Sequence, residues 1–294
     1  MEKIKVLLDT DIGNDIDDAV ALAYLLRQPR CELVGITTVT GRPVERAMLA
    51  SVICTAAGEH NIPIYPGCEM PLMQFQQQSQ VPQAAVLDRF PHKTNFPMRQ
   101  HISFMIDTIR SNPGEVTLLC IGPLTNIALL FATDPEIPML IKDLVMMCGD
   151  FTKPSEPQPK PEWNAKLDTV ATAMVYRSLV KNSRTFGLNT TKRVKMTAGE
   201  VRRAFQTDIL KTILPMAEVW FEKWDFTSFH DPLAAVSIFD NALCTFERGD
   251  ISVELFEEGA AGTTLWQPDA QDGRHLVAFD VDENRFFKSY FSVF

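Results

Sequence analysis

The sequence predicts an α/β protein with a Rossmann-like, mostly parallel central sheet flanked by helices. Two observations predict it: apolar runs of strand length alternate with longer amphipathic segments, and the runs are continuously apolar instead of alternating in polarity. Continuous apolar runs are typical of parallel strands covered on both faces, and the alternation is typical of helical crossovers. Because neither a repeat nor a shift of composition divides the chain, we expect a single domain over residues 1–294.

The expected elements of the first two thirds follow in order. Strands are expected at Ile4–Leu8, Leu33–Val39, Val116–Ile121, Leu144–Cys148 and Arg184–Leu188. Helices are expected at Asp18–Arg27, Val44–Ala57, Met98–Arg110, Thr125–Ala132 and Thr169–Val180. In sheets of this kind ligands bind beyond the carboxyl ends of the strands, so the loops that follow the strands are the place to look for chemistry.

Two long stretches interrupt this rhythm. Gln74–Pro97 is rich in glutamine and proline, and Thr152–Glu162 contains four prolines, which exclude a helix interior. Both are expected to be surface loops, either walls of a site or plain insertions. The remaining elements are expected to be a helical stretch at Ala198–Trp224 broken or kinked at Pro215, strands at Ser252–Leu255, Thr263–Trp266 and Leu276–Asp280, and a helix near Glu283–Phe291.

Composition excludes several classes of protein. The chain has 28 Lys and Arg against 37 Asp and Glu, a formal net charge of −9, which argues against a general nucleic-acid binder. No apolar run approaches the roughly 18–20 residues that span a bilayer, and the first apolar stretch runs directly into acidic residues, unlike a secretory signal. The six scattered cysteines contain no CxxC and are expected to be thiols of a cytoplasmic, reducing compartment.

The chemically most informative segment follows the first expected strand. Within ten residues, and without any lysine or arginine, it carries Asp9, Asp11, Asp15, Asp17 and Asp18. Carboxylates this close repel one another, and the start of the next helix offsets only part of that repulsion. Carboxylate oxygens are hard ligands for Ca²⁺ or Mg²⁺, so a divalent ion is the economical explanation, with capping and solvation as the alternative.

Three further motifs stand at the starts of other expected elements. Gly122–Asn126 follows a strand, Pro161–Asn164 follows the proline-rich stretch, and His230-Asp231-Pro232 begins an apolar helical run that Asp231 can cap. Each is weak alone. The opening Asp9-Thr10-Asp11 also fits a phosphatase with an aspartate nucleophile, although the later lysine and acidic pair that such an enzyme needs are not evident.

Together and in this order, these motifs resemble the inosine-uridine preferring nucleoside hydrolase family over nearly the whole chain. The opening DxDxGxDDA pattern of that family stands here as Asp9, Asp11, Gly13 and Asp17–Ala19. Similar segments continue at Ile36–Gly41, Ile62–Leu72, Gly122–Ala128, Glu162–Asn164, Gly187–Asn189, His230–Pro232 and Val281–Phe287. The resemblance implies the nucleoside hydrolase fold and hydrolysis of the N-glycosidic bond of ribonucleosides, a step of purine or pyrimidine salvage.

The resemblance also implies a bound Ca²⁺. Its ligands would be Asp11, Asp18, Asp231 and the backbone carbonyl of Ile121, together with water and two ribose hydroxyls. Asp11 would in addition be the general base that takes a proton from the attacking water. Because the ion holds a vicinal diol, a 2-deoxyribose would leave polar groups unpaired, which predicts selectivity for ribose.

The remaining family roles fall on residues that would hold the sugar and the leaving base. Asp17, Glu162 and Asn164 would bind ribose hydroxyls, and His230 would lie near the leaving base. The opening loop is two residues longer than the short form of the family, within Asn14–Ile16, and an alignment from the left makes Asp15 a rival to Asp17.

Three other residues are candidates for contacts with substrate. Arg42 stands where the family usually has an asparagine that contacts the sugar, and it either neutralises the acidic cluster, binds a phosphate or points to solvent. Trp220 and Trp224 lie four residues apart, on one helix face, and are either core residues or a wall that stacks on the base. Arg42 also favours the alternative of a retuned or non-catalytic relative that binds a ribosyl or sugar ligand. A homo-oligomer, dimer or tetramer, is expected from the family.

Overall fold

The protein is built around a nine-stranded sheet. The computed structural model describes residues 3–153, 155–268 and 273–294. In chain order the strands of this sheet are β1 (Ile4–Thr10), β2 (Cys31–Thr38), β3 (Ile64–Pro66), β4 (Val116–Cys120), β5 (Asp143–Met147), β6 (Ser183–Phe186), β9 (Cys244–Val253), β10 (Thr264–Pro268) and β11 (His275–Val281). Their order across the sheet is β10-β9-β11-β6-β5-β4-β1-β2-β3.

The sheet is mostly parallel, as the apolar runs predicted. Every pair from β3 to β11 along the sheet is parallel, and only β9 pairs antiparallel with β10 and β11. Near the carboxyl end of β1, Asp9 lies opposite Thr37 of β2 and Cys120 of β4. The loops after β1 and β4 therefore begin side by side, which brings the aspartate-rich segment next to Ile121 and Gly122.

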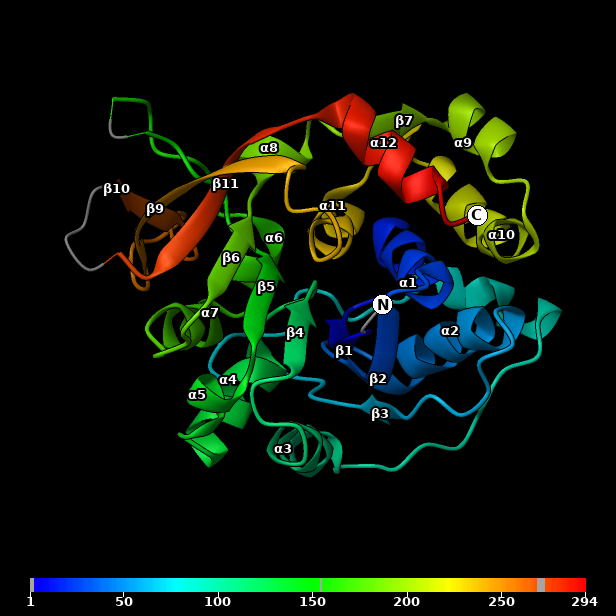
Figure 1. Ribbon diagram of the computed structural model, residues 1–294, viewed down its shortest axis with the longest axis horizontal. Coiled ribbons are helices and arrows are strands. Elements are labelled where there is room, and N and C mark those ends of the chain that lie inside the picture. The colour runs from blue at the N-terminus through cyan, green and yellow to red at the C-terminus, as the bar shows by residue number, and fades with distance from the viewer. Residues whose placement is uncertain (1–2, 154, 269–272) are drawn as a thin grey trace.

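The helices form two layers, one on each face of the sheet (Figure 1). One layer contains α1 (Asp17–Arg27), α2 (Pro43–Ala56), α10 (Asp208–Phe221), α11 (His230–Ser237) and α12 (Glu283–Phe291). The other contains α3 (His101–Arg110), α4 (Thr125–Thr133), α5 (Ile137–Leu140) and α7 (Thr169–Tyr176). Shorter elements are η1 (Pro82–Arg89), a 3₁₀ helix, with α6 (Trp163–Leu167), α8 (Leu188–Thr191) and α9 (Ala198–Ala204).

Alternate residues of the central strands supply the two cores. In β1, Val6 and Leu8 pack into the cluster that contains α1 and α2, whereas Leu7 between them packs into the cluster that contains α4 and α7. All three are fully buried. Successive side chains of a strand point to opposite faces, so a strand between two helical layers must be apolar at every position. This is the physical reason for the continuous apolar runs.

The C-terminal third differs from the expectation in three places. The stretch Ala198–Trp224 is two helices, and the chain breaks between Ala204 and Asp208, not at Pro215, which lies inside α10. The strand expected at Ser252–Leu255 is the end of a longer strand, β9, that begins at Cys244. Two short strands, β7 (Lys195–Thr197) and β8 (Phe226–Ser228), form a separate antiparallel pair that the sequence did not indicate.

The two long loops differ in content. Gln74–Pro97 contains η1, which packs against α2 and α10, so this stretch is more structured than expected. The described part of Thr152–Glu162 has no helix interior, as its prolines predicted, and Pro154 lies outside the described residues.

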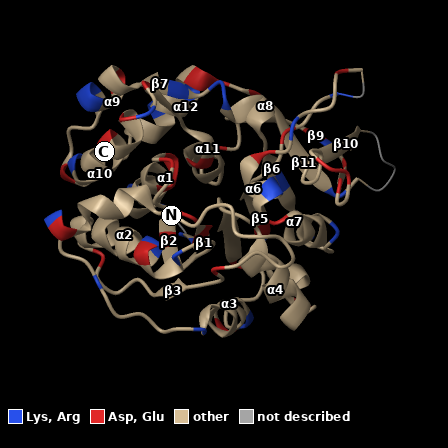
Figure 2. Cartoon of the chain, turned by 180° about the vertical axis from the view of Figure 1, so that it is seen from behind, with Lys and Arg blue, Asp and Glu red and all other residues tan. Residues whose placement is uncertain are grey.

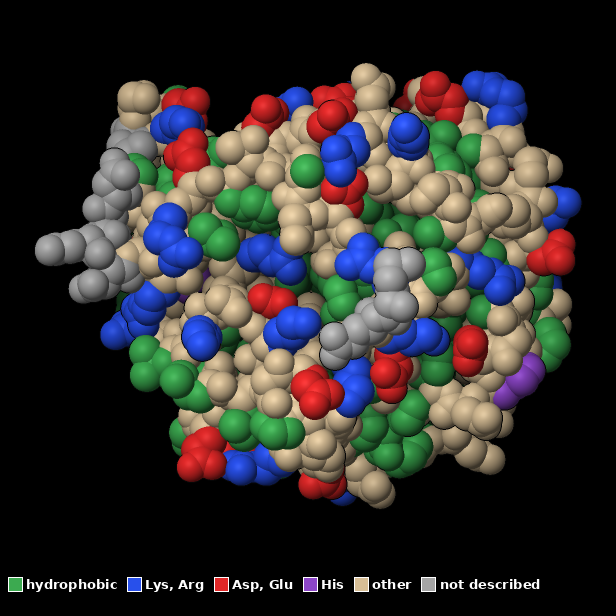
Figure 3. Space-filling view, in the orientation of Figure 1, with side chains coloured by type: hydrophobic (Ala, Val, Ile, Leu, Met, Phe, Trp, Pro, Cys, Tyr) green, Lys and Arg blue, Asp and Glu red, His purple; other side chains and the backbone are tan. Residues whose placement is uncertain are grey.

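Surface and cysteine features agree with the composition. Basic and acidic side chains are interspersed over the face shown in Figure 3. Among the described residues no helix is both long and apolar enough to cross a membrane. All six cysteines are free thiols.

Candidate active site

The aspartate-rich loop is shaped by its own backbone and by Thr10. The Thr10 hydroxyl, at the end of β1, accepts a hydrogen bond from the Ile12 amide at 3.1 Å and donates to the Asp18 carboxylate at 2.5 Å. Gly13 has a φ of +127°, and a Cβ there would lie 2.4 Å from Val81. A glycine is therefore required at this position, because it alone permits both the backbone turn and the close approach of the Gln74–Pro97 loop.

Three carboxylates from opposite ends of the chain converge beyond this loop. Asp17 and Asp18 lie in the first turn of α1, and Asp231 lies in the first turn of α11. One carboxylate oxygen of each lies within 4.8 Å of the others, and all three side chains are buried. The Asp231 amide donates to the Asp17 carboxylate at 3.2 Å, which locks the two helix starts together. We call these three residues the acidic cluster; Figure 2 shows acidic residues on both helices where they lie side by side.

The electrostatics of the acidic cluster are those of uncompensated negative charge. Burial, and next the mutual repulsion of neighbouring carboxylates, raise the pKa of Asp17, Asp18 and Asp231 well above the usual range of an aspartate. Arg46 is a buried cation close enough to favour the ionised form of Asp18, but it is one charge against three. The donor set of hard oxygens and its excess of negative charge fit a divalent cation.

Asp11 lies beside the acidic cluster but outside its tightest group. Its carboxylate accepts a 2.6 Å hydrogen bond from the buried side-chain amide of Gln78, and a Cβ on Gly122 would lie 2.8 Å from its other oxygen. Burial raises the pKa of Asp11, whereas Arg46 and the Gln78 amide lower it. Arg46 in turn donates to the backbone carbonyls of Asp11, Ile12 and Gly41, so it holds the loop by its backbone.

Glu162 and Asn164 form the wall contributed by α6. Glu162 caps the helix and accepts hydrogen bonds from the amides of Gly149, Asn164 and Ala165 at 2.8–3.0 Å. Burial nevertheless raises its pKa to about 7. The Asn164 side-chain amide donates to the carbonyls of Ile121 and Met147, both at 3.1 Å. α6 is thereby fixed to the ends of β4 and β5.

Asp9 is enclosed by the protein and helps to hold together the strands that surround the site. One of its oxygens accepts hydrogen bonds from Thr37 at 2.5 Å and from Asn126 at 2.7 Å. The side chain is fully buried, and burial raises its pKa to about 7. Asn126 also accepts from the Cys68 amide and donates to the Thr38 carbonyl, so it ties β1, β2 and the loop after β3 together. This enclosure disfavours Asp9 as the nucleophile of a phosphatase.

His230 and Arg42 have different surroundings. His230 lies next to Asp231 at the start of α11, and its Nδ1 is 2.7 Å from the Thr191 hydroxyl. Burial lowers its pKa to about 4, so the ring is neutral at neutral pH. Arg42 has left-handed backbone angles at the start of α2, and its half-exposed guanidinium pairs with Glu45 at 3.0 Å. Arg42 thus makes an ion pair at the surface, and its contact with substrate stays a prediction.

The two tryptophans of α10 contact each other. The rings of Trp220 and Trp224 stack with centroids 5.9 Å apart, and the Trp220 indole donates to the carbonyl of Phe226 in β8. Trp224 is 50% exposed, whereas Trp220 is partly buried and packs against the core. No contact between these rings and the acidic cluster is found among the described residues, so a role in binding the base stays a prediction.

The structure distinguishes between Asp15 and Asp17 by position. Asp17 belongs to the acidic cluster, whereas the Asp15 carboxylate accepts a hydrogen bond from the adjacent Ile16 amide at 2.6 Å. The start of α1 at Asp17 matches the alignment that anchors the pair Asp17-Asp18 on the helix.

Two side chains of the site were not identified from the sequence. Arg46 carried a signal, since it lies on the same face of α2 as the buried Leu49, Ala50 and Ile53, where an arginine needs partners. Gln78 carried none, because it is one of several glutamines in a stretch without periodicity.

Comparison with known proteins agrees with this geometry. The family model described as inosine-uridine preferring nucleoside hydrolase matches residues 6–288. The chain belongs to this family. Its members are hydrolases that act on the N-glycosyl bond of ribonucleosides.

Individual relatives and structures of the family align over most of the chain. The inosine-uridine preferring nucleoside hydrolase of Leishmania major is 29% identical over 303 residues, which cover 96% of this chain and 95% of that protein. The probable uridine nucleosidase 2 of Oryza sativa is 29% identical, over 85% of this chain and 78% of its own length. Among solved structures, an inosine-guanosine nucleoside hydrolase superposes with a TM-score of 0.85 at 20% identity, over 98% of both chains. A purine-preferring ribonucleoside hydrolase from Gardnerella vaginalis superposes with a TM-score of 0.82 at 23% identity, over 98% of this chain and 97% of that one.

Proposed function

We propose that this protein is a Ca²⁺-dependent hydrolase that splits a ribonucleoside into a free base and ribose. The observation that carries the proposal is the convergence of Asp17, Asp18 and Asp231, three buried carboxylates with too little positive charge around them. Family membership supports the reaction class. The convergence of carboxylates and the family membership together support a cation at the acidic cluster that would bind a sugar diol and a nucleophilic water.

The residues that would hold the cation are Asp11, Asp18, Asp231 and the carbonyl of Ile121. Asp18 and Asp231 belong to the acidic cluster, Asp11 lies beside Gly122, and the Ile121 carbonyl faces Asn164. Among hard cations, Ca²⁺ tolerates the irregular set of oxygen ligands that such loops provide. When bound, the ion would orient the sugar diol and lower the pKa of a water molecule.

Side chains of the protein would supply the general base, the contacts with the sugar and the stabilisation of the developing positive charge. Asp11 would accept the proton of the attacking water, a role worth about 10²–10⁴-fold in rate. Asp17, Glu162 and Asn164 would hold ribose hydroxyls from two sides. As the N-glycosidic bond lengthens, the sugar becomes oxocarbenium-like, and the surrounding carboxylates stabilise its positive charge.

His230 is proposed to assist departure of the base. Its ring is neutral at neutral pH, and Thr191 engages its Nδ1. If Thr191 donates to Nδ1, the ring proton resides on Nε2, from where it can donate a hydrogen bond to the leaving base. The stacked Trp220 and Trp224 are kept as a proposed aromatic wall for that base, and Arg42 as a proposed substrate contact.

The test is a substrate panel assayed for free reducing sugar. Ribonucleosides and 2-deoxyribonucleosides are incubated with the wild-type protein, with and without a chelator, and with Asp11→Ala and Asp231→Ala. We expect cleavage of ribonucleosides only, lost with chelator and in both variants. Asp107→Ala, which removes an exposed carboxylate from α3, is the matched control. Full turnover by the Asp11 or Asp231 variant would exclude the mechanism.

Two further expectations remain proposals of the family resemblance. We propose a homo-oligomer, dimer or tetramer, which light scattering of the purified protein would measure. We also propose a cytoplasmic location, which fractionation of the source cells would test. Neither enters the argument for the reaction.

A further inference from the structure

A buried glutamine of the loop after β3 contacts the carboxylate of the proposed general base. Gln78 is 3% exposed and Asp11 is 6% exposed, so their contact is shielded from bulk water. The Gln78 Nε2 donates to Asp11 Oδ2 at 2.6 Å, and the Gln78 Oε1 accepts from the Trp163 indole at 2.5 Å. Both polar ends of the glutamine are therefore paired, one with the proposed base and the other with the first residue of α6.

The indole determines which end of the Gln78 amide faces Asp11. A tryptophan Nε1–H can only donate a hydrogen bond, so its partner on Gln78 must be the amide oxygen. The amide nitrogen then faces Asp11, where it needs an acceptor, and an ionised carboxylate oxygen is one. Trp163, Gln78 and Asp11 thus form a directed chain of hydrogen bonds that fixes the orientation of each group.

The second oxygen of Asp11 lies on another side of the carboxylate. A Cβ on Gly122 would lie 2.8 Å from Asp11 Oδ1, so this oxygen lies against the residue that follows Ile121. The carbonyl of Ile121 is a proposed cation ligand and also accepts from Asn164 at 3.1 Å. Since Gln78 binds Oδ2, Oδ1 is the oxygen left for a cation and a water molecule.

The segment that carries Gln78 packs tightly on two other loops at the same edge of the sheet. A Cβ on Gly41, in the loop after β2, would lie 2.3 Å from the Gln78 carbonyl oxygen. A Cβ on Gly13, in the loop after β1, would lie 2.4 Å from Val81. The backbone is therefore held at Gln78 itself and three residues further on, which fixes the position of the Gln78 side chain relative to Asp11.

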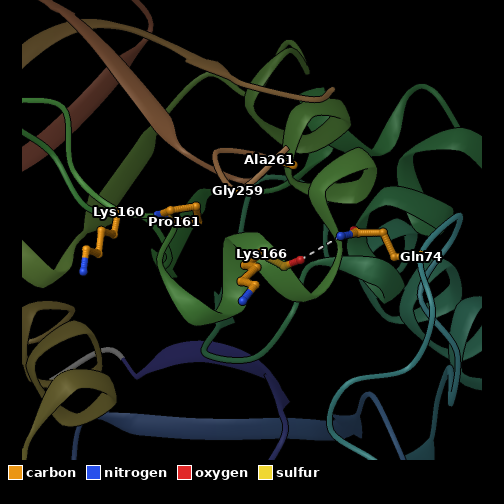
Figure 4. A pocket seen from close by; sticks show the side chains of 6 residues that line it. All are labelled: Gln74, Lys160, Pro161, Lys166, Gly259 and Ala261. Carbon is orange, nitrogen blue, oxygen red and sulfur yellow. Dashed lines mark hydrogen bonds between the residues drawn. The ribbon is translucent and has the colours of Figure 1, made fainter. Parts of the chain in front are cut away.

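Gln74 anchors the same loop at a different place. At the cavity shown in Figure 4, its side chain donates to the Lys166 carbonyl of α6 at 3.0 Å, and it accepts from the Thr169 amide at 2.6 Å. Neither partner belongs to the proposed site. Of these two glutamines, Gln78 contacts the proposed base and Gln74 holds the loop, so the pair separates the two roles experimentally.

We propose that Gln78 is a positioning residue that fixes the rotation of the Asp11 carboxylate, with Trp163 orienting the glutamine. The inference rests on the proposed function, in which Asp11 holds a cation and accepts a proton from water. The terminal torsion of an aspartate is broad, so a carboxylate without such a partner would present its oxygens correctly for only a fraction of the time. Partners that orient a metal ligand in this way are worth about 10–100-fold in metal affinity or activity.

The first test compares isosteric substitutions at glutamines of the loop, with uridine and inosine as substrates. At saturating calcium, Gln78→Met is expected to lower kcat about tenfold to a hundredfold and to change KM by less than about threefold, since other residues hold the sugar. Trp163→Phe removes only the indole donor and is expected to lower kcat about twofold to tenfold.

Two matched controls accompany these variants. Gln77→Met changes the exposed neighbour of Gln78, and Gln74→Met loosens the same loop without touching Asp11. Both should keep the wild-type kcat, and melting curves confirm that each variant is folded. A fall of kcat in Gln74→Met as large as in Gln78→Met would assign the effect to packing of the loop and overturn the inference.

The second test is a double-variant cycle in which calorimetry measures calcium affinity. If Gln78 acts through Asp11, Gln78→Met weakens calcium binding about tenfold when Asp11 is present. In the Asp11→Asn background the same substitution should change calcium affinity little, because no carboxylate is left to orient. Equal losses in the two backgrounds would mean that Gln78 does not act through Asp11 and would overturn the inference.

These measurements separate failure of the inference from failure of the proposed function. If the wild-type protein cleaves nucleosides and binds calcium, and Gln78→Met changes neither, the inference is wrong and the proposed function stands. If nothing is cleaved but calcium affinity depends on Gln78 through Asp11, the reaction is wrong and the positioning role stands. A wild-type protein that neither cleaves nucleosides nor binds calcium overturns both.

Discussion

Two regions of the molecule bury carboxylates in opposite ways. At the starts of α6 and α7, Glu162 and Asp168 each accept several hydrogen bonds from neutral donors. In the acidic cluster, Asp17, Asp18 and Asp231 face one another. All five side chains are buried, and all lie at the starts of helices. The two groups of carboxylates therefore share burial and position at a helix start, and they differ in the groups that each carboxylate contacts.

At the starts of α6 and α7, the carboxylates accept hydrogen bonds from backbone amides that have no partner within the helix. Asp168 accepts from the Ala171 amide at 3.0 Å, from the Leu72 amide at 2.8 Å and from the Thr125 hydroxyl at 2.7 Å. These contacts satisfy both oxygens and join α7, α4 and the loop after β3. Such a buried, satisfied carboxylate stabilises the fold.

In the acidic cluster the carboxylates accept too few hydrogen bonds to offset their negative charge. Asp18 accepts from Thr10, Asp17 accepts from the Asp231 amide, and burial, followed by mutual repulsion, raises the pKa of all three carboxylates. A group of this kind costs folding free energy unless a cation binds. The comparison teaches that the partners of a buried carboxylate, and not its burial, separate a carboxylate that caps backbone amides from a candidate cation ligand.

The largest expected effect comes from neutralising one member of the acidic cluster. Asp18→Asn is expected to lower kcat/KM for ribonucleosides by about 10³-fold, because it removes a proposed cation ligand. In the presence of chelator the same variant should unfold at a higher temperature than the wild type, since one repulsive charge is gone. Steady-state assays and calorimetric melting check the two effects. If Asp18→Asn instead lost activity and also unfolded at a lower temperature than the wild type in the presence of chelator, Asp18 would be a residue that stabilises the fold and not a cation ligand.

The next largest effect is expected from a substitution at the start of α7. Asp168→Ala is expected to lower the free energy of unfolding by about 3 kcal/mol, because it leaves buried donors unsatisfied. Urea unfolding at neutral pH measures this, and Asp107→Ala is the exposed control. Any surviving folded protein should still bind calcium. A change below about 0.5 kcal/mol would show that the α6–α7 hydrogen bonds do not stabilise the fold.

A third effect tests the cation directly. Calcium at about one hundred times its dissociation constant should raise the free energy of unfolding by about 2.7 kcal/mol. Asp231→Asn should abolish most of this gain, whereas Asp107→Asn should retain it. Melting curves over a calcium titration give the measurement. Equal stabilisation of wild type and Asp231→Asn would disconnect the acidic cluster from calcium.

The smallest effect concerns a buried titratable group outside both regions. Burial lowers the pKa of His275 in β11 to about 4, and this imidazole lies edge-on to Tyr176. Between this value and the ordinary 6.5 the unfolded chain binds the additional proton, so stability is lost as the pH falls. The loss is expected to be about 2 kcal/mol at pH 5 relative to pH 8. Urea unfolding of the wild type and His275→Gln checks this, and an equal pH dependence in both would contradict it.

Local patterns were sufficient where neighbours in the chain decide the structure. The apolar runs predicted β1, β2, β4, β5 and β6, because each strand is covered on both faces by helices. Patterning was misleading at Ala198–Trp224, where a helical pattern conceals the break between α9 and α10. It also gave no sign of β7 and β8, since three-residue strands are set by the pairing of distant segments.

The sequence by itself determined the α/β class, the order of its central elements and the presence of an acidic segment at the end of the first strand, since these depend on residues a few positions apart. Only the tertiary structure decided which side chains meet. Asp17 and Asp231 are 214 residues apart, yet their hydrogen bond depends on the packing of α1 against α11. The Gln78 contact with Asp11 depends likewise on the path of the loop after β3. Contacts of this range are set by strand order and layer packing, which no local pattern records.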